Sequence, residues 1–186
     1  MKILAFAATT STTSINRQLI DYATRLLDDG LVADVEVENI DLNDYEMPIY
    51  SIDRQNESGI PSAAHDFFDR IGAADAVLIS FAEHNGFYTA AYKNLFDWAS
   101  RIDMRVYQDK PAVLFSTSIG PSGGRNVLDT AVMSGQFFGY DDTASLAIPS
   151  FHESFDTDTG SLGNVELDDQ FRAALTTLND TAGVPA

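Results

Sequence analysis

The chain contains no cysteine, which excludes disulfide bonds, a thiolate nucleophile and cysteine-ligated zinc or iron–sulfur sites. It also lacks any apolar run near the roughly 20 residues that a membrane-spanning helix requires. The apolar run at residues 3–8 is too short for the core of a signal peptide. From these absences we expect a soluble protein of the reducing cytoplasm that has no membrane partner.

Positive charge is scarce in this chain. Eleven lysines and arginines stand against 28 aspartates and glutamates, which gives a formal net charge of −17. Nucleic acids and anionic lipid surfaces are bound through basic patches, so this composition argues against both as partners. Apolar residues make up 45% of the 186 residues, which is enough for one hydrophobic core of ordinary size. We therefore expect a single domain over residues 1–186.

Two periodicities alternate along the chain. Apolar runs and period-two alternation predict β-strands, whereas apolar residues spaced by three and four predict amphipathic helices. The strands are expected at residues 2–7, 35–40, 76–81, 111–116 and 144–148, and the helices at residues 15–27, 63–72, 89–102, 127–138 and 168–178. The polar segments 41–58 and 151–165 are expected to be loops. Strands that alternate with helices form a parallel sheet with helices on both faces, so the fold class is α/β.

Ligands of such sheets bind beyond the carboxyl ends of the strands, where the strand order reverses. The loops to consider follow the first, third and fourth strands, at residues 8–16, 82–89 and 117–124. Although about three acids would be expected in any twenty residues of this chain, none occurs in residues 1–20, 84–96 or 110–128. Buried strands exclude acids in any protein, but burial does not explain why the polar loops beside them also contain so few acids. An anionic ligand bound by these loops would explain it.

Each loop offers chemistry that suits such a ligand. The first is rich in hydroxyl groups directly before a helix, an arrangement that can hold a phosphate group. A simple helix cap accounts for Ser14 but not for the five hydroxyls before it. In the second loop, Asn85-Gly86 predicts a tight turn beside His84. The third loop carries glycines that let the backbone approach a flat ring, namely Gly120, Gly123 and Gly124. Together the loops predict a phosphorylated aromatic cofactor.

Three motifs carry a family resemblance. Residues 8–19 (ATTSTTSINRQL) follow G-S-x-R-x-x-S-x-N-R-x-L, with Ala8 in place of Gly and Ser11 in place of a phosphate-facing Arg. Residues 82–87 (AEHNGF) and 92–101 (YKNLFDWASR) follow P-E-Y-N-G-S and L-K-N-x-x-D-W-x-S-R, and residues 117–124 (TSIGPSGG) follow T-S-x-G-x-x-G-G. With these motifs in order, the chain resembles the NAD(P)H-dependent FMN reductase family over roughly residues 1–178.

The resemblance implies a flavodoxin-like three-layer sandwich whose five parallel strands have the order 2-1-3-4-5. It implies FMN as cofactor, NADPH or NADH as co-substrate, a flavin, quinone or azo compound as small-molecule electron acceptor, and a homodimer or tetramer. The flavin would carry the hydride chemistry, so no catalytic side chain is required. His84 stands where the family has a Tyr at the flavin edge, and it either packs there or tunes the potential or protonates a quinone. The implied cofactor-binding residues are Thr9, Ser11, Ser14, Ile15, Asn16, Glu83, His84, Asn85, Gly86, Thr117, Ser118, Gly120, Gly123 and Gly124.

Two other functions stay open on the sequence. A flavodoxin-type electron carrier would share the fold and FMN without turning over NAD(P)H, and its acidic surface would suit a basic partner. A serine hydrolase would use Ser122 in the sequence G-x-S-x-G, followed along the chain by Asp141 or Asp142 and by His152. The three histidines lack the spacing of metal ligands, so no metal site is predicted.

Overall fold

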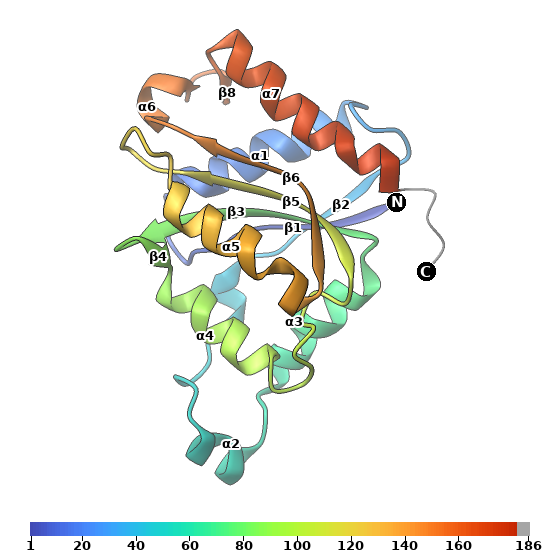
Figure 1. Cartoon of the computed structure of the whole chain (residues 1–186), viewed down its shortest axis with the longest axis vertical. Helices are drawn as coiled ribbons and strands as arrows, with labels where there is room; N and C mark the ends of the chain where they lie inside the picture. The colour runs from blue at the N-terminus through green and yellow to red at the C-terminus, as the bar shows by residue number, and fades with distance from the viewer. Residues whose placement is uncertain (182–186) are drawn as a thin grey trace.

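A computed structural model describes the backbone of residues 1–181 and their side chains, except those of Asp142, Asp180 and Thr181. At its centre, five parallel strands lie in the order β2-β1-β3-β5-β6 (Figure 1). They are β1 (Lys2–Ala7), β2 (Glu36–Asn39), β3 (Ala76–His84), β5 (Lys110–Thr117) and β6 (Tyr140–Ile148). The predicted order 2-1-3-4-5 is confirmed, and the strand order reverses between β1 and β3.

Helices cover both faces of this sheet, as the sequence predicts. One face packs against α1 (Ile15–Asp28) and α7 (Val165–Thr176), and the other against α3 (Ser62–Ala73), α4 (Ala90–Ala99) and α5 (Arg125–Phe138). Alternate residues of β1 point to opposite faces, so Ile3 belongs to the first core and Leu4 to the second. The result is a three-layer sandwich with a separate apolar core on each side of the sheet.

The start of β6 differs from the expectation. The strand begins at Tyr140 rather than at residue 144, because its backbone pairs with β5 from Lys110 onward. The register shifts between Ala112 and Val113, which marks an irregularity of the bulge type. Asp141 and Asp142 interrupt the apolar pattern in the first half of β6, so apolar periodicity does not predict this part of the strand.

Two segments expected to be loops contain short elements. Residues 41–58 hold the 3-10 helix η1 (Leu42–Tyr45) and the helix α2 (Ile52–Ser58). None of the α2 side chains is buried, and the helix stands out from the body of the molecule in Figure 1. The other segment holds α6 (Phe151–Ser154) and a hairpin of β7 (Phe155–Asp156) and β8 (Ser161–Leu162). A two-residue strand, β4 (Phe87–Tyr88), folds back on β3, and the 3-10 helix η2 (Thr177–Thr181) follows α7.

Candidate functional site

One open cavity of about 300 Å³ is lined by the loop after β1 with the start of α1, by the last residues of β3, and by the end of β5 with the loop after it. Its volume is at the lower end of the size range of ligand pockets. Strand β3 continues to His84, beyond the expected end at residue 81, so it is the strand end and not the turn after it that lines the cavity. Nine expected cofactor-binding residues line it: Thr9, Ser11, Ser14, Ile15, Asn16, Glu83, His84, Thr117 and Ser118. Five expected residues are not part of this lining: Asn85, Gly86, Gly120, Gly123 and Gly124. Three residues outside the expected set complete it: Thr13, Ala82 and Ile119.

The first loop presents donors of hydrogen bonds but no charge. Ser14 caps α1, because its hydroxyl oxygen accepts the backbone N–H groups of Asn16 and Arg17 at 3.1 and 3.3 Å. In the described part of the chain, the backbone N–H groups of Thr12, Thr13 and Ile15 have no acceptor. Free N–H groups before the positive end of a helix favour an anion. Arg17 does not add its charge there, since it forms an ion pair with Asp41 at 2.7 Å.

Asn16 ties the first loop to the centre of the sheet. Its side chain is almost completely buried, and its Oδ1 atom accepts hydrogen bonds from the Ser80 hydroxyl (2.8 Å) and the Thr117 backbone N–H (3.1 Å). Its Nδ2 atom donates to the Thr117 carbonyl oxygen at 3.2 Å. Most of the hydrogen-bonding capacity of Asn16 is therefore used within the protein, and this residue shapes the cavity by joining α1, β3 and β5.

The second loop is a hairpin fixed on two sides. Asn85 and Gly86 both have positive φ angles, 54° and 79°, as a two-residue hairpin turn of type I′ requires, and they place β4 against the end of β3. The Glu83 carboxylate accepts the backbone N–H of Val127 in the first turn of α5 at 3.0 Å. The Thr89 hydroxyl donates to the Ala8 carbonyl oxygen at 2.9 Å and caps α4. Glu83 therefore acts as an anchor of the hairpin on α5.

The glycines of the third loop are explained by the fold around them. Gly123 has a φ of 62°, and a Cβ atom there would lie 2.7 Å from the carbonyl carbon and oxygen of Ile148. Gly124 has a φ of 78°, and its Cβ would lie 3.2 Å from that of Ser116. A Cβ on Gly120 would meet no atom closer than 3.9 Å. Glycine is thus required at the first two positions by close contact with β5 and β6, and only Gly120 borders open space.

Ile119 forms an apolar rim on the cavity. It is 75% exposed, although the loop that carries it is held firmly: the Ser118 carbonyl oxygen accepts the Phe151 N–H, and the Thr117 hydroxyl donates to the Ile148 carbonyl oxygen. The only sequence signal for Ile119 is that it is apolar within a loop of Ser, Gly and Pro. Thr13, the other polar lining residue outside the expected set, belongs to the hydroxyl run of the first loop.

The second half of the second motif, residues 92–101, lies mostly on α4 and holds the segment that precedes α2. Asn94 Nδ2 donates to the carbonyl oxygens of Met47 and Pro48, each at 3.2 Å, and its Oδ1 accepts the Tyr50 N–H. Trp98 is buried and donates from Nε1 to the Pro48 carbonyl oxygen at 2.7 Å. These residues are therefore packing and anchoring residues of the fold.

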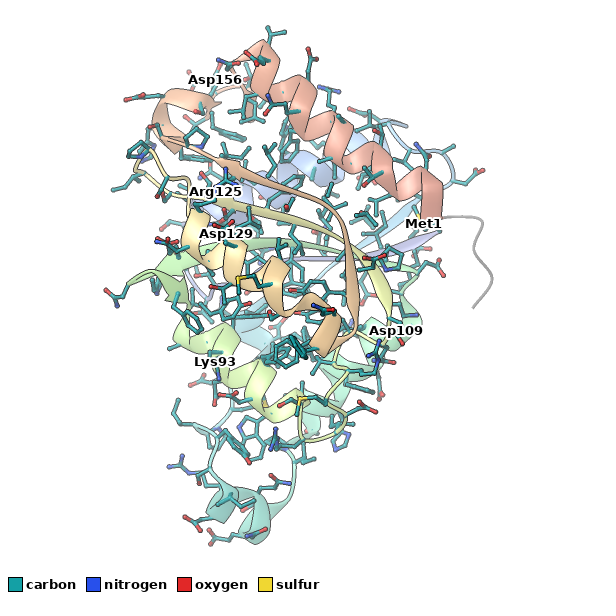
Figure 2. The ribbon with its side chains drawn as sticks, viewed as in Figure 1. Met1, Lys93, Asp109, Arg125, Asp129 and Asp156 are labelled. Atoms are coloured by element: carbon teal, nitrogen blue, oxygen red, sulfur yellow. The ribbon has the colours of Figure 1, made fainter. Side chains whose placement is uncertain are left out.

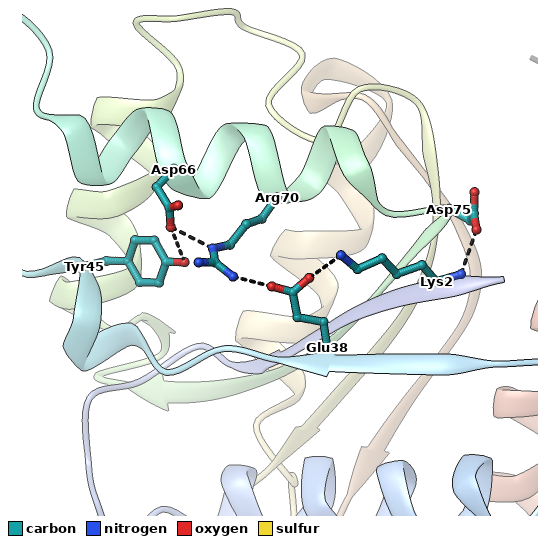
Figure 3. Close-up of polar contacts among 6 residues, drawn as sticks. All are labelled: Lys2, Glu38, Tyr45, Asp66, Arg70 and Asp75. Carbon is teal, nitrogen blue, oxygen red and sulfur yellow. Dashed lines mark hydrogen bonds and ion pairs between the residues drawn. The ribbon is translucent and has the colours of Figure 1, made fainter.

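A larger cavity, of about 440 Å³, lies between β2, η1 and α3. Three of its polar lining residues are engaged in one network: the Tyr45 hydroxyl donates to Asp66, and Arg70 bridges Asp66 and Glu38 (Figure 3). No residue of the three strand-end loops lines this cavity. We therefore regard the smaller cavity as the candidate site.

The serine hydrolase hypothesis fails on geometry. Ser122 is exposed in the third loop, beyond the carboxyl end of β5. His152 lies just after β6, but Asp141 and Asp142 lie near the start of that strand. A strand rises about 3.3 Å per residue, so the acids are about 20 Å from the end where the serine and histidine lie. These residues do not form a triad.

Comparisons with known proteins agree with this fold. The sequence matches the family model described as NADPH-dependent FMN reductase over residues 1–140. It is 31% identical over 126 residues to an NADPH:quinone oxidoreductase of Arabidopsis thaliana, a match that covers 68% of the chain and 62% of that protein. It is 29% identical over 124 residues to an NAD(P)H-dependent FMN reductase of Pseudomonas aeruginosa, covering 66% of the chain and 63% of that protein. The chain thus spans somewhat less than two thirds of each of these relatives.

Solved structures show the same fold. The flavoenzyme NAD(P)H:(acceptor) oxidoreductase FerB of Paracoccus denitrificans superposes with a TM-score of 0.74 at 22% identity, covering 96% of this chain and 95% of that chain. An FMN-dependent NADH-azoreductase of Bacillus anthracis, in complex with FMN, superposes with a TM-score of 0.71 at 13% identity, covering 96% and 100%. The family model covers most of the chain, including all three strand-end loops. The chain belongs to the NADPH-dependent FMN reductase family.

Proposed function

We propose that this protein holds FMN in the cavity formed by the three strand-end loops and works as an NAD(P)H-dependent oxidoreductase. The observation that carries the proposal is that three segments, far apart in sequence and free of acidic residues except Glu83, line one cavity at the point where strand order reverses. Bound FMN would accept a hydride from NADPH or NADH and pass electrons to a small acceptor such as a flavin, quinone or azo compound.

The residues present suit an anionic flat ligand. The Ser11 and Thr13 hydroxyls and the unpaired N–H groups of the first loop would hold the phosphate. His84 of the hairpin and Ser118 and Ile119 of the third loop would border the ring. The Glu83 carboxylate is already paired with a backbone N–H of α5, so it adds a fixed support for the hairpin. The side chains of this site bind and orient, and none of them is required as an acid or base for hydride transfer.

The test is spectroscopic. Purified protein titrated with FMN should quench the flavin fluorescence and retain a yellow colour after gel filtration. Anaerobic addition of NADPH or NADH should then bleach the absorbance of the bound flavin, at a rate fast enough to support turnover. Bound flavin that neither nucleotide bleaches would favour the electron carrier instead. A protein that binds no FMN would disprove the proposal.

We propose a neutral, apolar acceptor of the quinone type. The net charge of −17 repels anionic acceptors, and Ile119 places an exposed apolar side chain at the rim of the cavity. A neutral naphthoquinone should be reduced with a higher kcat/KM than the same ring carrying a sulfonate group. Added salt should reduce the difference in kcat/KM between the two acceptors, because it screens the charge of the protein. Equal rates for both acceptors at low salt would contradict this choice.

His84 offers a separate question about protons. Its side chain is exposed at the edge of the cavity and forms no hydrogen bond with the described residues. We propose that it packs at the flavin edge and that the proton of the reduced acceptor comes from solvent. A His84→Phe variant should then keep the wild-type dependence of kcat on pH between about pH 5 and 8. If the variant loses a limb of the wild-type curve of kcat against pH, His84 is the donor of the proton to the reduced acceptor.

We also propose a homodimer or tetramer that uses the outer face of α5 and β4. These two elements pack together, and they expose Phe87, Met133 and Phe137, the last two at 74% and 67%. Exposed apolar groups that cluster in this way mark interaction surfaces. Light scattering should show a smaller mass for Met133→Glu. Val165→Glu, at a 77% exposed position on α7, should leave the mass unchanged.

The single domain over residues 1–186 and the cytoplasmic location stay predictions. The last five residues of that domain lie outside the described part of the chain. No helix among the described residues is long and apolar enough to cross a bilayer. Limited proteolysis tests the domain, since a single domain should yield one resistant core, and cell fractionation tests the location.

A further inference from the structure

Arg125 differs from the other basic side chains of this acidic protein. The chain has eleven lysines and arginines, all within the described residues. Six of them form ion pairs with carboxylates, and four others donate hydrogen bonds to uncharged oxygens. Arg125 is the remaining one. Its backbone N–H donates to the Ser122 carbonyl oxygen, but its guanidinium forms no hydrogen bond or ion pair with a described residue.

A suitable acid is nevertheless available to Arg125. Asp129 follows four residues later on the same helix, and both residues are labelled in Figure 2. On α4 the same spacing and order produce an ion pair, because Lys93 contacts Asp97 at 2.6 Å. The Arg125 guanidinium does not contact Asp129 in this way. Its charge is therefore free for an anion from outside the protein.

The position of Arg125 places this charge beside the candidate site. It is the first residue of α5, directly after the third loop (Figure 2). The first turn of α5 is fixed against the hairpin by the hydrogen bond from Val127 N–H to Glu83, and Glu83 lines the cavity. Arg125 itself is exposed and is not part of the lining. It also lies within residues 110–128, which contain no acid.

We propose that Arg125 binds a phosphate group of the nicotinamide co-substrate. This inference rests on the proposed function. NADH and NADPH both carry a pyrophosphate, and NADPH carries a further 2′-phosphate. A guanidinium donates paired, charge-assisted hydrogen bonds to such groups. A protein of net charge −17 repels this anionic co-substrate except where acids are absent and a cation is free. Arg125 would position the co-substrate without contact with the reacting atoms.

The test is Arg125→Gln in the FMN-loaded protein, with NADH and NADPH varied at a saturating concentration of quinone. The KM for the co-substrate should rise about tenfold while kcat stays the same, because the lost contact is equal in the ground state and the transition state. If the KM rises for both nucleotides, Arg125 binds the pyrophosphate. If the KM rises for NADPH alone, Arg125 binds the 2′-phosphate. Calorimetric titration with NADP⁺ or NAD⁺ should show the same loss of affinity without turnover, and Arg125→Lys should restore part of it.

The matched control is Arg105→Gln. This variant removes the same charge, but Arg105 pairs with Asp109, which lies on the opposite side of the molecule from Arg125 in Figure 2. It should leave both KM values unchanged. Arg125→Gln should also keep the unfolding midpoint of the wild type, because no contact within the fold is lost. If the wild type turns over and Arg125→Gln has wild-type KM values, the inference is overturned while the proposed function stands. If the wild type does not turn over, it is the proposed function that fails.

Discussion

The side-chain amide of Asn16 pairs with the backbone of Thr117 in both directions. Nδ2 donates to the Thr117 carbonyl oxygen at 3.2 Å, and Oδ1 accepts the Thr117 N–H at 3.1 Å. The two residues are 101 positions apart and both are buried. This contact holds the first loop of the cavity against the third. Asn16 therefore stabilises the tertiary structure around the cavity, which an exposed helix cap does not do.

Asn16→Ala should destabilise the protein by about 2–4 kcal/mol, because buried polar groups of Thr117 and the Ser80 hydroxyl lose their partner. Urea unfolding measures this change. Asn56→Ala on the exposed helix α2 is the control, and it should stay within about 0.5 kcal/mol of the wild type. Equal effects of the two substitutions would show that the contact with Thr117 contributes little to stability.

Gly123 and Gly120 form a matched pair in the third loop. Gly123→Ala should cost about 3 kcal/mol or more, since it combines a φ of 62° with a Cβ atom 2.7 Å from the backbone of Ile148. Gly120→Ala should change the free energy of unfolding by less than about 1 kcal/mol, because its surroundings are open. Thermal unfolding of the two variants tests the difference. A stable Gly123→Ala protein would contradict the close approach of this loop to β6.

Ser11→Arg should strengthen FMN binding. The first loop offers the phosphate only neutral donors, and Ser11 lines the cavity at the position where the family carries an arginine. A new guanidinium there should lower the Kd for FMN about tenfold through charge-assisted hydrogen bonds. Fluorescence titration at low salt gives the Kd. Thr12→Arg adds the same charge to a neighbouring exposed residue outside the lining, and a similar gain with that variant would point to a general field effect.

Because of Glu38, the free energy of unfolding should depend on pH in the acid range. The Lys2 ammonium and then the Arg70 guanidinium hold the pKa of Glu38 below its ordinary value of 4.5, against the opposing effect of burial (Figure 3). Because the folded-state pKa is depressed, this contribution is complete above pH 4.5 and is lost as the pH falls through the lowered pKa. Glu38→Gln should cost about 1 kcal/mol at pH 7 and little near pH 2.

Denaturant unfolding of the Glu38→Gln variant at both pH values gives the comparison. Glu57→Gln on α2 removes an exposed acid with the same change of charge, so its effect should be small at either pH. A cost for Glu38→Gln that is the same at pH 7 and pH 2 would mean that the ion pairs with Lys2 and Arg70 are not its source.

The sequence by itself determined the architecture and predicted the place of the candidate site. The five strands and their helices follow from local periodicity, because each element shows one or both faces to an apolar core. The scarcity of acids in the three loops, where Glu83 is the one acidic residue, could be found from composition, because it is a property of the residues themselves. The turn at Asn85-Gly86 also depends only on local chemistry, and it is present.

The tertiary structure alone decided what individual residues of those loops do. Nothing near Gly123 in the sequence reveals that Ile148 lies against it, and nothing near Glu83 reveals the N–H of Val127 that it accepts. The same holds for Arg125, whose charge is free only because Asp129, at the usual spacing, is not its partner. Such roles depend on contacts between segments far apart in the chain or on the direction of a side chain, and a linear pattern contains neither.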